Sequence, residues 1–257
     1  MNERTLAIRR GLPVTVSGIT LYPVLMTHYE EFLSCKDVFS MRLSSLPAAY
    51  ASMDYLSALY RMDYDFSHIT GNQTGIFERA LQMYALSMRI SSEEMANGIR
   101  VRMRDEEPVF EGLDIGGVLL SSFQLSTRFR EIIAEQNGIL LPNESDNAEI
   151  MESYKWKQKK EAVASRLRVS LDDLIASVAF QSRLREADIL DFTVHEFERR
   201  RNAIDRDKRY SLYTGAELSG FIKFKNGNPA PSWCFDLEDG GLGTVATAEI
   251  TKKLDGN

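Results

Sequence analysis

Histidine and cysteine, the residue types that most often do chemistry, are few in this sequence and widely separated. The histidines are His28, His68 and His195, and the cysteines are Cys35 and Cys234. None of them has the HExxH, Cys-x-x-Cys or Cys–His spacing that brings zinc ligands together. We interpret Cys35, beside an apolar helix stripe, and Cys234, between two aromatic residues, as buried and inert thiols. The sequence therefore predicts no catalytic residue, no metal site and no enzyme activity.

One glycine pattern formally matches a cofactor motif. In residues 238–250, EDGGLGTVATAEI, Gly241, Gly243 and Ala246 have the spacing of the dinucleotide fingerprint. That fingerprint holds a pyrophosphate only when it follows a core strand and opens the helix of a βαβ unit. Neither is predicted here, so we expect a loop before a short helix and no bound cofactor.

The stretch TVHEFERRRNAIDRDKRYSLY, residues 193–213, carries the strongest charge pattern. Ten of the fourteen residues in 196–209 are charged, six basic and four acidic. Thr193 and Glu196 have capping-box spacing, which predicts one long helix reaching about residue 221. Acid-first pairs at i, i+4 join Glu196 to Arg200 and Asp205 to Arg209, so the charges partly neutralise one another.

Two interpretations of this helix stay open, a solvated face and a face that binds another protein. Nucleic-acid binding is disfavoured because the segment carries only +2 and the chain as a whole −6, with a pI near 5.3. If the face binds a protein, its candidate residues are Arg199, Arg200, Arg201, Arg206, Arg209 and Tyr213.

The loop after this helix, NGNPAPSWCFD at residues 226–236, adds two further candidate residues. Its two prolines fix the backbone, and Trp233 and Phe235 follow them. The two aromatic side chains either pack against the end of the core or anchor a partner, because tryptophan is enriched at binding hot spots.

Apolar periodicity predicts the remaining elements. Residues 13–24 and 99–115 indicate two hairpins, the second edged with charges that discourage aggregation. Amphipathic stripes predict helices that begin near Thr27, near Pro47, behind Thr74 and behind Ser170, and a helix containing Leu125 and Phe129 that ends at Asn137. A short helix is expected at 185–192. The fold class is therefore α+β and predominantly α-helical, with six or more helices and two small β-hairpins.

The domain organisation is less sharply marked. Residues 140–169 open with turn residues and become strongly charged, which indicates a connector or a solvated helix. We expect an α+β region at 1–139 and a helical region at 170–257, with a single compact domain as the alternative. The sequence has no run of 18 apolar residues and no apolar segment typical of a signal peptide, so we expect no membrane contact and a cytoplasmic location.

The C-terminal pattern also resembles a known family. Thr193, Glu196 and Phe197 open an arginine-rich helix that continues to Tyr213 and Ala216. This succession, within residues 170–236, resembles the C-terminal part of the tail assembly chaperones of long-tailed bacteriophages. The whole chain is similar to uncharacterised prophage proteins of Gram-positive bacteria, although its length and its two hairpins differ from the chaperone pattern.

The resemblance implies a helical, non-enzymatic protein in the cytoplasm of a bacterial host. Such chaperones bind the long tape measure protein during tail assembly and help bring tube subunits to it. The expected partner is therefore the tape measure protein or another tail protein, and a homo-oligomer is possible. The alternatives are a structural tail component or adaptor that stays in the virion, and a nucleic-acid-binding phage regulator.

Overall fold

The computed structural model describes residues 3–50, 52–72, 74–104, 106–142, 170–220, 224, 228–230 and 232–234. The chain divides into two compact units, Met1–Phe197 and Glu198–Asn257. The described residues are mostly helical and include a two-stranded and a three-stranded antiparallel sheet. This confirms the predicted class, α+β with helices dominating.

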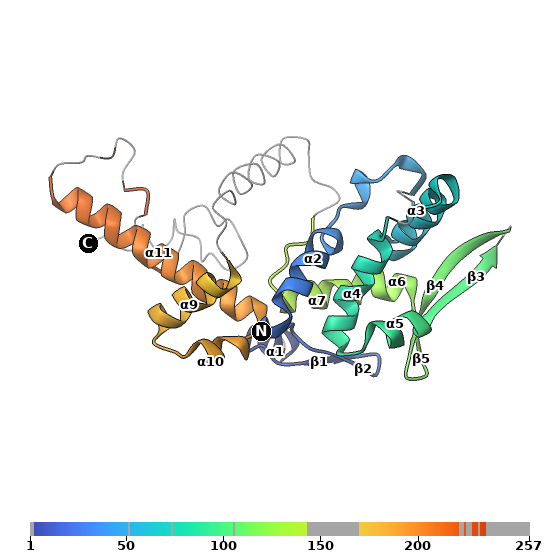
Figure 1. The fold of residues 1–257 in the computed structure, drawn as a ribbon, viewed down its shortest axis with the longest axis horizontal. Coiled ribbons are helices and arrows are strands. Elements are labelled where there is room, and N and C mark those ends of the chain that lie inside the picture. The colour runs from blue at the N-terminus through green and yellow to red at the C-terminus, as the bar shows by residue number, and fades with distance from the viewer. Residues whose placement is uncertain are drawn as a thin grey trace. The chain divides into compact units, whose positions relative to one another are not determined.

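The first unit is built from short and medium helices with both sheets (Figure 1). Its α-helices before the charged connector are α1 Glu3–Arg9, α2 Tyr29–Phe39, α3 Tyr55–Thr70, α4 Ile76–Met88, α5 Ser92–Gly98, α6 Ser122–Gln124 and α7 Arg130–Gln136. Three 3-10 turns, Met26–His28, Leu43–Ser45 and Ala48–Tyr50, and a π-helical turn at Leu125–Phe129 join them. Further helices are α9 Leu171–Ser182, α10 Glu186–Leu190 and α11 Val194–Leu218, of which α11 continues into the second unit.

The N-terminal hairpin forms where the sequence predicts it. Strands β1 (Val14–Val16) and β2 (Ile19–Leu21) pair through a two-residue turn at Ser17 and Gly18. Both turn residues have positive φ, 51° and 82°. Such a turn matches the right-handed twist of the two strands.

The second predicted hairpin is part of a larger sheet. Strands β3 (Ile99–Arg104) and β4 (Glu107–Ile115) form it, and β5 (Val118–Ser121) adds a third strand in the order β3-β4-β5. The turn before β5 is the dipeptide at 116–117, two glycines with φ of 58° and 84°. This glycine pair was the sequence signal for the strand that the prediction missed.

One predicted helix start is wrong. Helix α3 begins at Tyr55 rather than near Pro47, because the Asp54 side chain accepts a hydrogen bond from the Ser57 backbone N–H and caps it. Helix α2 begins at Tyr29, close to the predicted Thr27, with His28 as its N-cap and no side-chain cap. Local spacing indicated the helices correctly, but not which polar residue begins them.

Aromatic side chains hold the core of the first unit together. Phe77 of α4 lies edge-on to Tyr60 of α3 and to Phe110 of β4, with ring centroids 5.2 and 5.1 Å apart. Phe39 of α2 and Tyr84 of α4 form a similar pair at 5.6 Å. These contacts bury large apolar areas and fix the sheet against the helices.

The start of α11 is tied to the N-terminal part of the chain. The Val194 N–H donates to the Val24 carbonyl at 2.8 Å, and the Met26 N–H donates to the Phe192 carbonyl at 2.9 Å. The predicted capping box at Thr193 and Glu196 forms, with N–O distances of 3.1 and 2.9 Å. The first turn of α11 therefore belongs firmly to the first unit.

The expected connector at 140–169 and the glycine pattern at 238–250 fall almost wholly outside the described residues. Helices α9 and α10, which lie in the expected C-terminal region, group with the first unit. The predicted capping box behind Ser170 forms at the start of α9, where the Ser170 Oγ accepts a hydrogen bond from the Asp173 backbone N–H.

Candidate protein-binding site

Helix α11 carries most of the predicted site and has no buried residue along its second-unit part. Of its 25 residues, only Val194 and Phe197, in the first turns, are buried. From Glu198 onward every residue is half-buried or exposed. A helix that is polar nearly all round depends on its own side-chain pairs or on a partner rather than on a core.

Ion pairs within α11 neutralise part of its charge. The Arg201 guanidinium lies 2.6 Å from the Glu198 carboxylate, and Arg209 lies 3.1 Å from Asp205, as its spacing predicted. The Glu196 carboxylate accepts the Thr193 backbone N–H at the start of the helix. The predicted pair of Asp205 with Arg209 is therefore confirmed, the pair of Glu198 with Arg201 was not predicted, and acidic neighbours on the helix neutralise both of these arginines.

The other predicted arginines differ in their exposure. Arg199 and Arg200 are exposed, and Arg206 is half-buried. Tyr213 is half-buried and lies edge-on to Phe224, with ring centroids 5.6 Å apart. Because Arg199, Arg206 and Tyr213 are spaced seven apart, they share one face of the helix.

The loop residue Trp233 is exposed to 61% of its area, which leaves a large amphipathic ring available to a partner. Phe235 lies outside the described residues. Cys234 is exposed, and the prediction of a buried thiol there is wrong, since the neighbouring Trp233 is itself exposed and does not cover it.

The histidines lie in separate places, and Cys35 is inert. His28 contacts Glu31 at 2.9 Å, whereas His68 stacks on Tyr64. Cys35 is fully buried in α2, and burial raises its pKa to about 12, which keeps the thiol protonated.

Within the described ranges there is no group of three or more His, Cys, Asp or Glu that could hold a metal ion, and no helix is long and apolar enough to span a membrane.

A cluster of polar side chains around Asp54 has the residue types of a reactive site, but its hydrogen bonds serve to join elements of the fold. The Asp54 Oδ1 atom accepts hydrogen bonds from the Ser122 and Ser126 hydroxyls at 2.6 and 2.7 Å, in addition to the Ser57 N–H. The Ser126 Oγ in turn accepts the Leu56 backbone N–H at 2.9 Å. The cluster joins the start of α3 to α6 and the π-helical turn, and its hydrogen-bonding groups are occupied in doing so.

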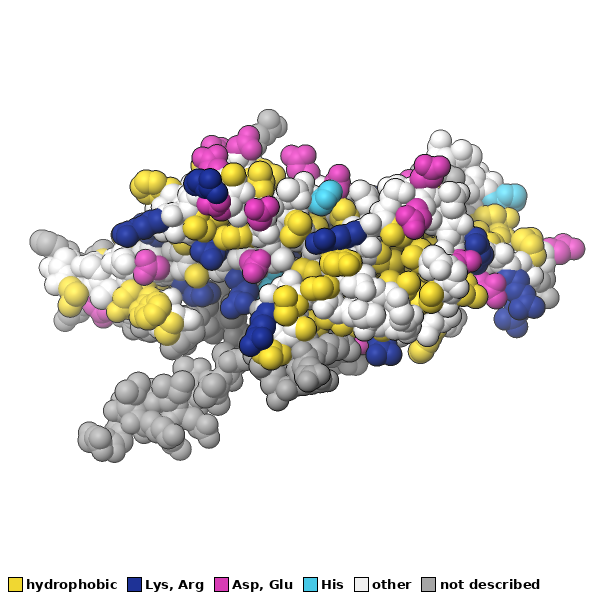
Figure 2. Space-filling model, turned by 90° about the horizontal axis from the view of Figure 1, so that it is seen from below, with side chains coloured by type: hydrophobic (Ala, Val, Ile, Leu, Met, Phe, Trp, Pro, Cys, Tyr) yellow, Lys and Arg dark blue, Asp and Glu magenta, His cyan; other side chains and the backbone are white. Residues whose placement is uncertain are grey.

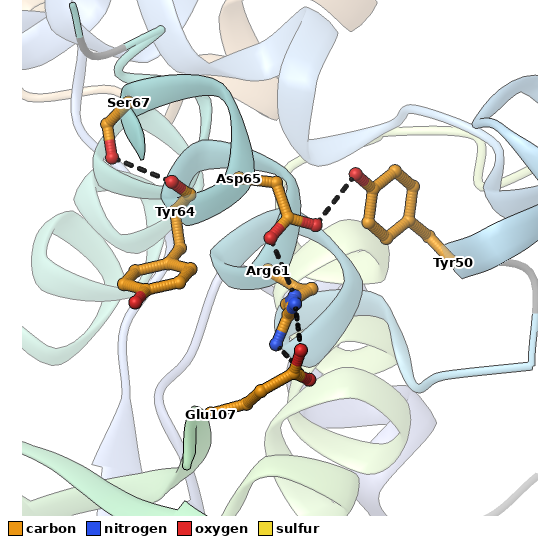
Figure 3. A network of polar contacts seen from close by, with 6 residues as sticks. All are labelled: Tyr50, Arg61, Tyr64, Asp65, Ser67 and Glu107. Carbon is orange, nitrogen blue, oxygen red and sulfur yellow. Dashed lines mark hydrogen bonds and ion pairs between the residues drawn. The ribbon is translucent and has the colours of Figure 1, made fainter. Parts of the chain in front are cut away.

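A second network fixes the β3–β4 hairpin to α3 (Figure 3). The Arg61 guanidinium donates to both carboxylate oxygens of Glu107, at 2.6 and 2.9 Å, and its Nε lies 2.9 Å from Asp65. Asp65 also accepts the Tyr50 hydroxyl at 3.0 Å. The Glu107 and then the Asp65 hydrogen bonds raise the pKa of Arg61, so this side chain stays charged.

The sheet beside this network carries a surface that sequence reasoning did not single out. An open hollow of about 460 Å³ is lined by Arg102, Met103, Arg104, Val109 and Glu111. The signal was present in the strand sequence IRVRMR, where arginine alternates with apolar residues. It was interpreted only as protection against aggregation.

Comparison with known proteins finds no matching family model, no matching curated protein and no matching solved structure.

Proposed function

We propose that this chain is a non-enzymatic bacteriophage protein of the tail assembly chaperone type, which binds the tape measure protein or another tail protein in the host cytoplasm. The observation that carries the proposal is α11, a long helix with no buried residue beyond Phe197. The exposed side chains along such a helix are available to a partner, whereas Arg206, Arg209 and Tyr213 are half-buried.

The charges on α11 favour a protein partner over a nucleic acid. Arg201 and Arg209 are each paired with a carboxylate of the same helix. A phosphate backbone would have to compete with these acids, whereas a protein surface with both signs of charge can match them. Exposed apolar side chains supply contact area beside the charges: Leu212, Leu218 and Trp233.

Co-expression with the tape measure protein, followed by affinity capture and size-exclusion chromatography, tests the proposal. We expect a complex, which Trp233→Ala weakens about thirtyfold, because a tryptophan anchor buried in an interface contributes roughly 2 kcal/mol. Reversing Arg199 together with Arg200 to glutamate should also weaken it. Arg128→Glu, on an exposed position of the first unit, serves as the control and should leave it unchanged.

Recovery of the chain alone at every salt concentration, with the tape measure protein and with the other tail proteins, would contradict the proposal. Retention on a DNA column that falls steeply with salt, and is lost on reversing Arg199 and Arg200, would instead support the regulator. Mass spectrometry of purified virions separates a chaperone, which is absent from them, from a structural component or adaptor.

A further inference from the structure

Strand β3 forms an open edge of the three-stranded sheet. Its partner is β4 on one side, and among the described residues no strand pairs with its other side. Every residue of β3 from Arg100 to Arg104 is exposed, and Ile99 is half-buried. Figure 1 shows the β3–β4 hairpin extending beyond the helices at one end of the first unit. Every second residue of such a strand turns its N–H and C=O groups outward, where they can pair with another chain.

The two faces of this edge differ in chemistry. Because side chains alternate along a strand, Arg100, Arg102 and Arg104 lie on one face, and Val101 and Met103 on the other. Met103 is 64% exposed and Val101 43%. In Figure 2, Lys and Arg side chains gather at the hairpin end of the first unit, on the right of the view.

Part of this arginine charge is not neutralised within the described part of the chain. Arg100 pairs with Asp114 at 2.9 Å, but Arg102 and Arg104 form no ion pair there. The other carboxylates of this face lie on β4: Glu107, opposite Arg104 and held by Arg61, and Glu111, which has no ion pair among the described residues. A strand added at the open edge would lie beside the arginines of β3, with these carboxylates one strand further away. Glu106, in the turn after β3, adds negative charge beyond Arg104 and would limit an acidic ligand to the length of the strand.

The edge is held in place before any partner arrives. Glu107, at the start of β4, accepts hydrogen bonds from both terminal nitrogens of the Arg61 guanidinium. At the other end of the hairpin, β4 has a bulge at Glu111, and the neighbouring Gly112 lies so close to the Leu120 carbonyl that a Cβ atom would collide with it. A preformed strand loses little conformational entropy when a peptide pairs with it.

We propose that β3 binds, by strand addition, an extended segment of another protein in which acidic residues alternate with apolar ones. The acidic side chains face Arg102 and Arg104, the apolar ones cover Val101 and Met103, and backbone hydrogen bonds extend the sheet. A second copy of β3 fits poorly, because any antiparallel register that keeps like faces together sets arginine opposite arginine. This surface is separate from α11, and the inference does not rest on the proposed function.

A fluorescent peptide in which glutamate alternates with valine tests the inference by anisotropy with the purified full chain. We expect saturable binding that a peptide with lysine in place of glutamate does not show. Reversing Arg102 and Arg104 to glutamate should weaken binding about tenfold, since two exposed ion pairs are replaced by repulsion. Replacing both by lysine keeps the charge and should retain most of the binding.

The matched control reverses two exposed arginines elsewhere on the first unit, Arg79→Glu with Arg128→Glu, and should bind like the unaltered chain. Hydrogen exchange of the β3 amides distinguishes strand addition from charge attraction alone. Strand addition slows exchange of the outward amides of β3, whereas charge attraction alone does not. Equal binding of the lysine peptide, equal weakening by the control variant, or β3 amides left unprotected at saturation would each overturn the inference. So would a dimer by light scattering that the β3 reversal abolishes.

Discussion

Arg130 is the residue on which the junction of α2, α3 and α7 depends. The residue is 7% exposed, and its guanidinium donates to the Phe39 carbonyl at 2.9 Å and to the Met41 carbonyl at 2.8 Å and lies 3.6 Å from the Tyr55 ring centroid. The two carbonyls belong to the end of α2 and the residues after it, where no helical partner is available. A single side chain therefore caps α2 and stacks on α3 at the same time.

Replacing Arg130 with methionine should lower the free energy of unfolding by about 3 kcal/mol, because it leaves buried carbonyl groups without a donor and removes a cation–π contact. Urea unfolding followed by circular dichroism measures the loss. Arg128→Met, two positions earlier and exposed, is the matched control and should change stability by less than about 0.5 kcal/mol. Equal midpoints for the two variants would contradict the capping role of Arg130.

At the scale of elements, the β1–β2 hairpin combines a favourable turn type with one strained residue. Ser17 adopts the left-handed region, φ 51°, although a serine side chain disfavours it. Asparagine tolerates this conformation better and is common at the first position of such turns.

Ser17→Asn should therefore raise the free energy of unfolding by about 0.5 kcal/mol, whereas Ser17→Val should lower it by about 1 kcal/mol, since a β-branched residue tolerates positive φ least. Thermal unfolding of both variants checks the opposite signs. A shift in the same direction for both Ser17 variants would argue against turn strain.

Local sequence patterns correctly predicted the elements whose determinants are close together in the sequence. Ser17–Gly18 was sufficient for the first hairpin, and Thr193 with Glu196 for the start of α11. The start of α3 was mispredicted because the apolar stripe runs back past Asp54, whose capping role is fixed by serines about 70 positions later. The open edge of β3 needed the strand order, which no local pattern contains.

The features of the candidate site likewise divide into those that local spacing predicted and those that it did not. The pair of Asp205 with Arg209 was predicted from i, i+4 spacing, because a helix brings those positions together, whereas the i, i+3 pair of Glu198 with Arg201 was not predicted. The exposure of Cys234 and the hydrogen bonds from Arg61 to Glu107 depend on how distant segments fold. Residue spacing along the sequence therefore could not predict either of them.

At the scale of the whole molecule, the buried acids of the first unit are thiol and phenol groups that remain protonated when folded. Burial raises the pKa of Cys35 from its ordinary 9.0 to about 12, and burial likewise raises the pKa values of Tyr55 and Tyr84 above 10.0. The unfolded chain ionises all three at lower pH than the folded chain does. Above pH 9 the unfolded state therefore binds fewer protons, and stability falls as pH rises.

Between pH 8 and pH 10 these groups should lower the free energy of unfolding by about 2 kcal/mol, most of it from Cys35, which titrates earliest when unfolded. Urea midpoints across this range measure the slope. Cys35→Ala should remove more than half of the slope even though the cavity it leaves lowers stability at every pH. Cys234→Ala, at the exposed thiol, should leave the slope as it is. The same slope in all three proteins would mean that alkaline unfolding is driven by charges on the surface rather than by the protonated core that packs α2 against α4.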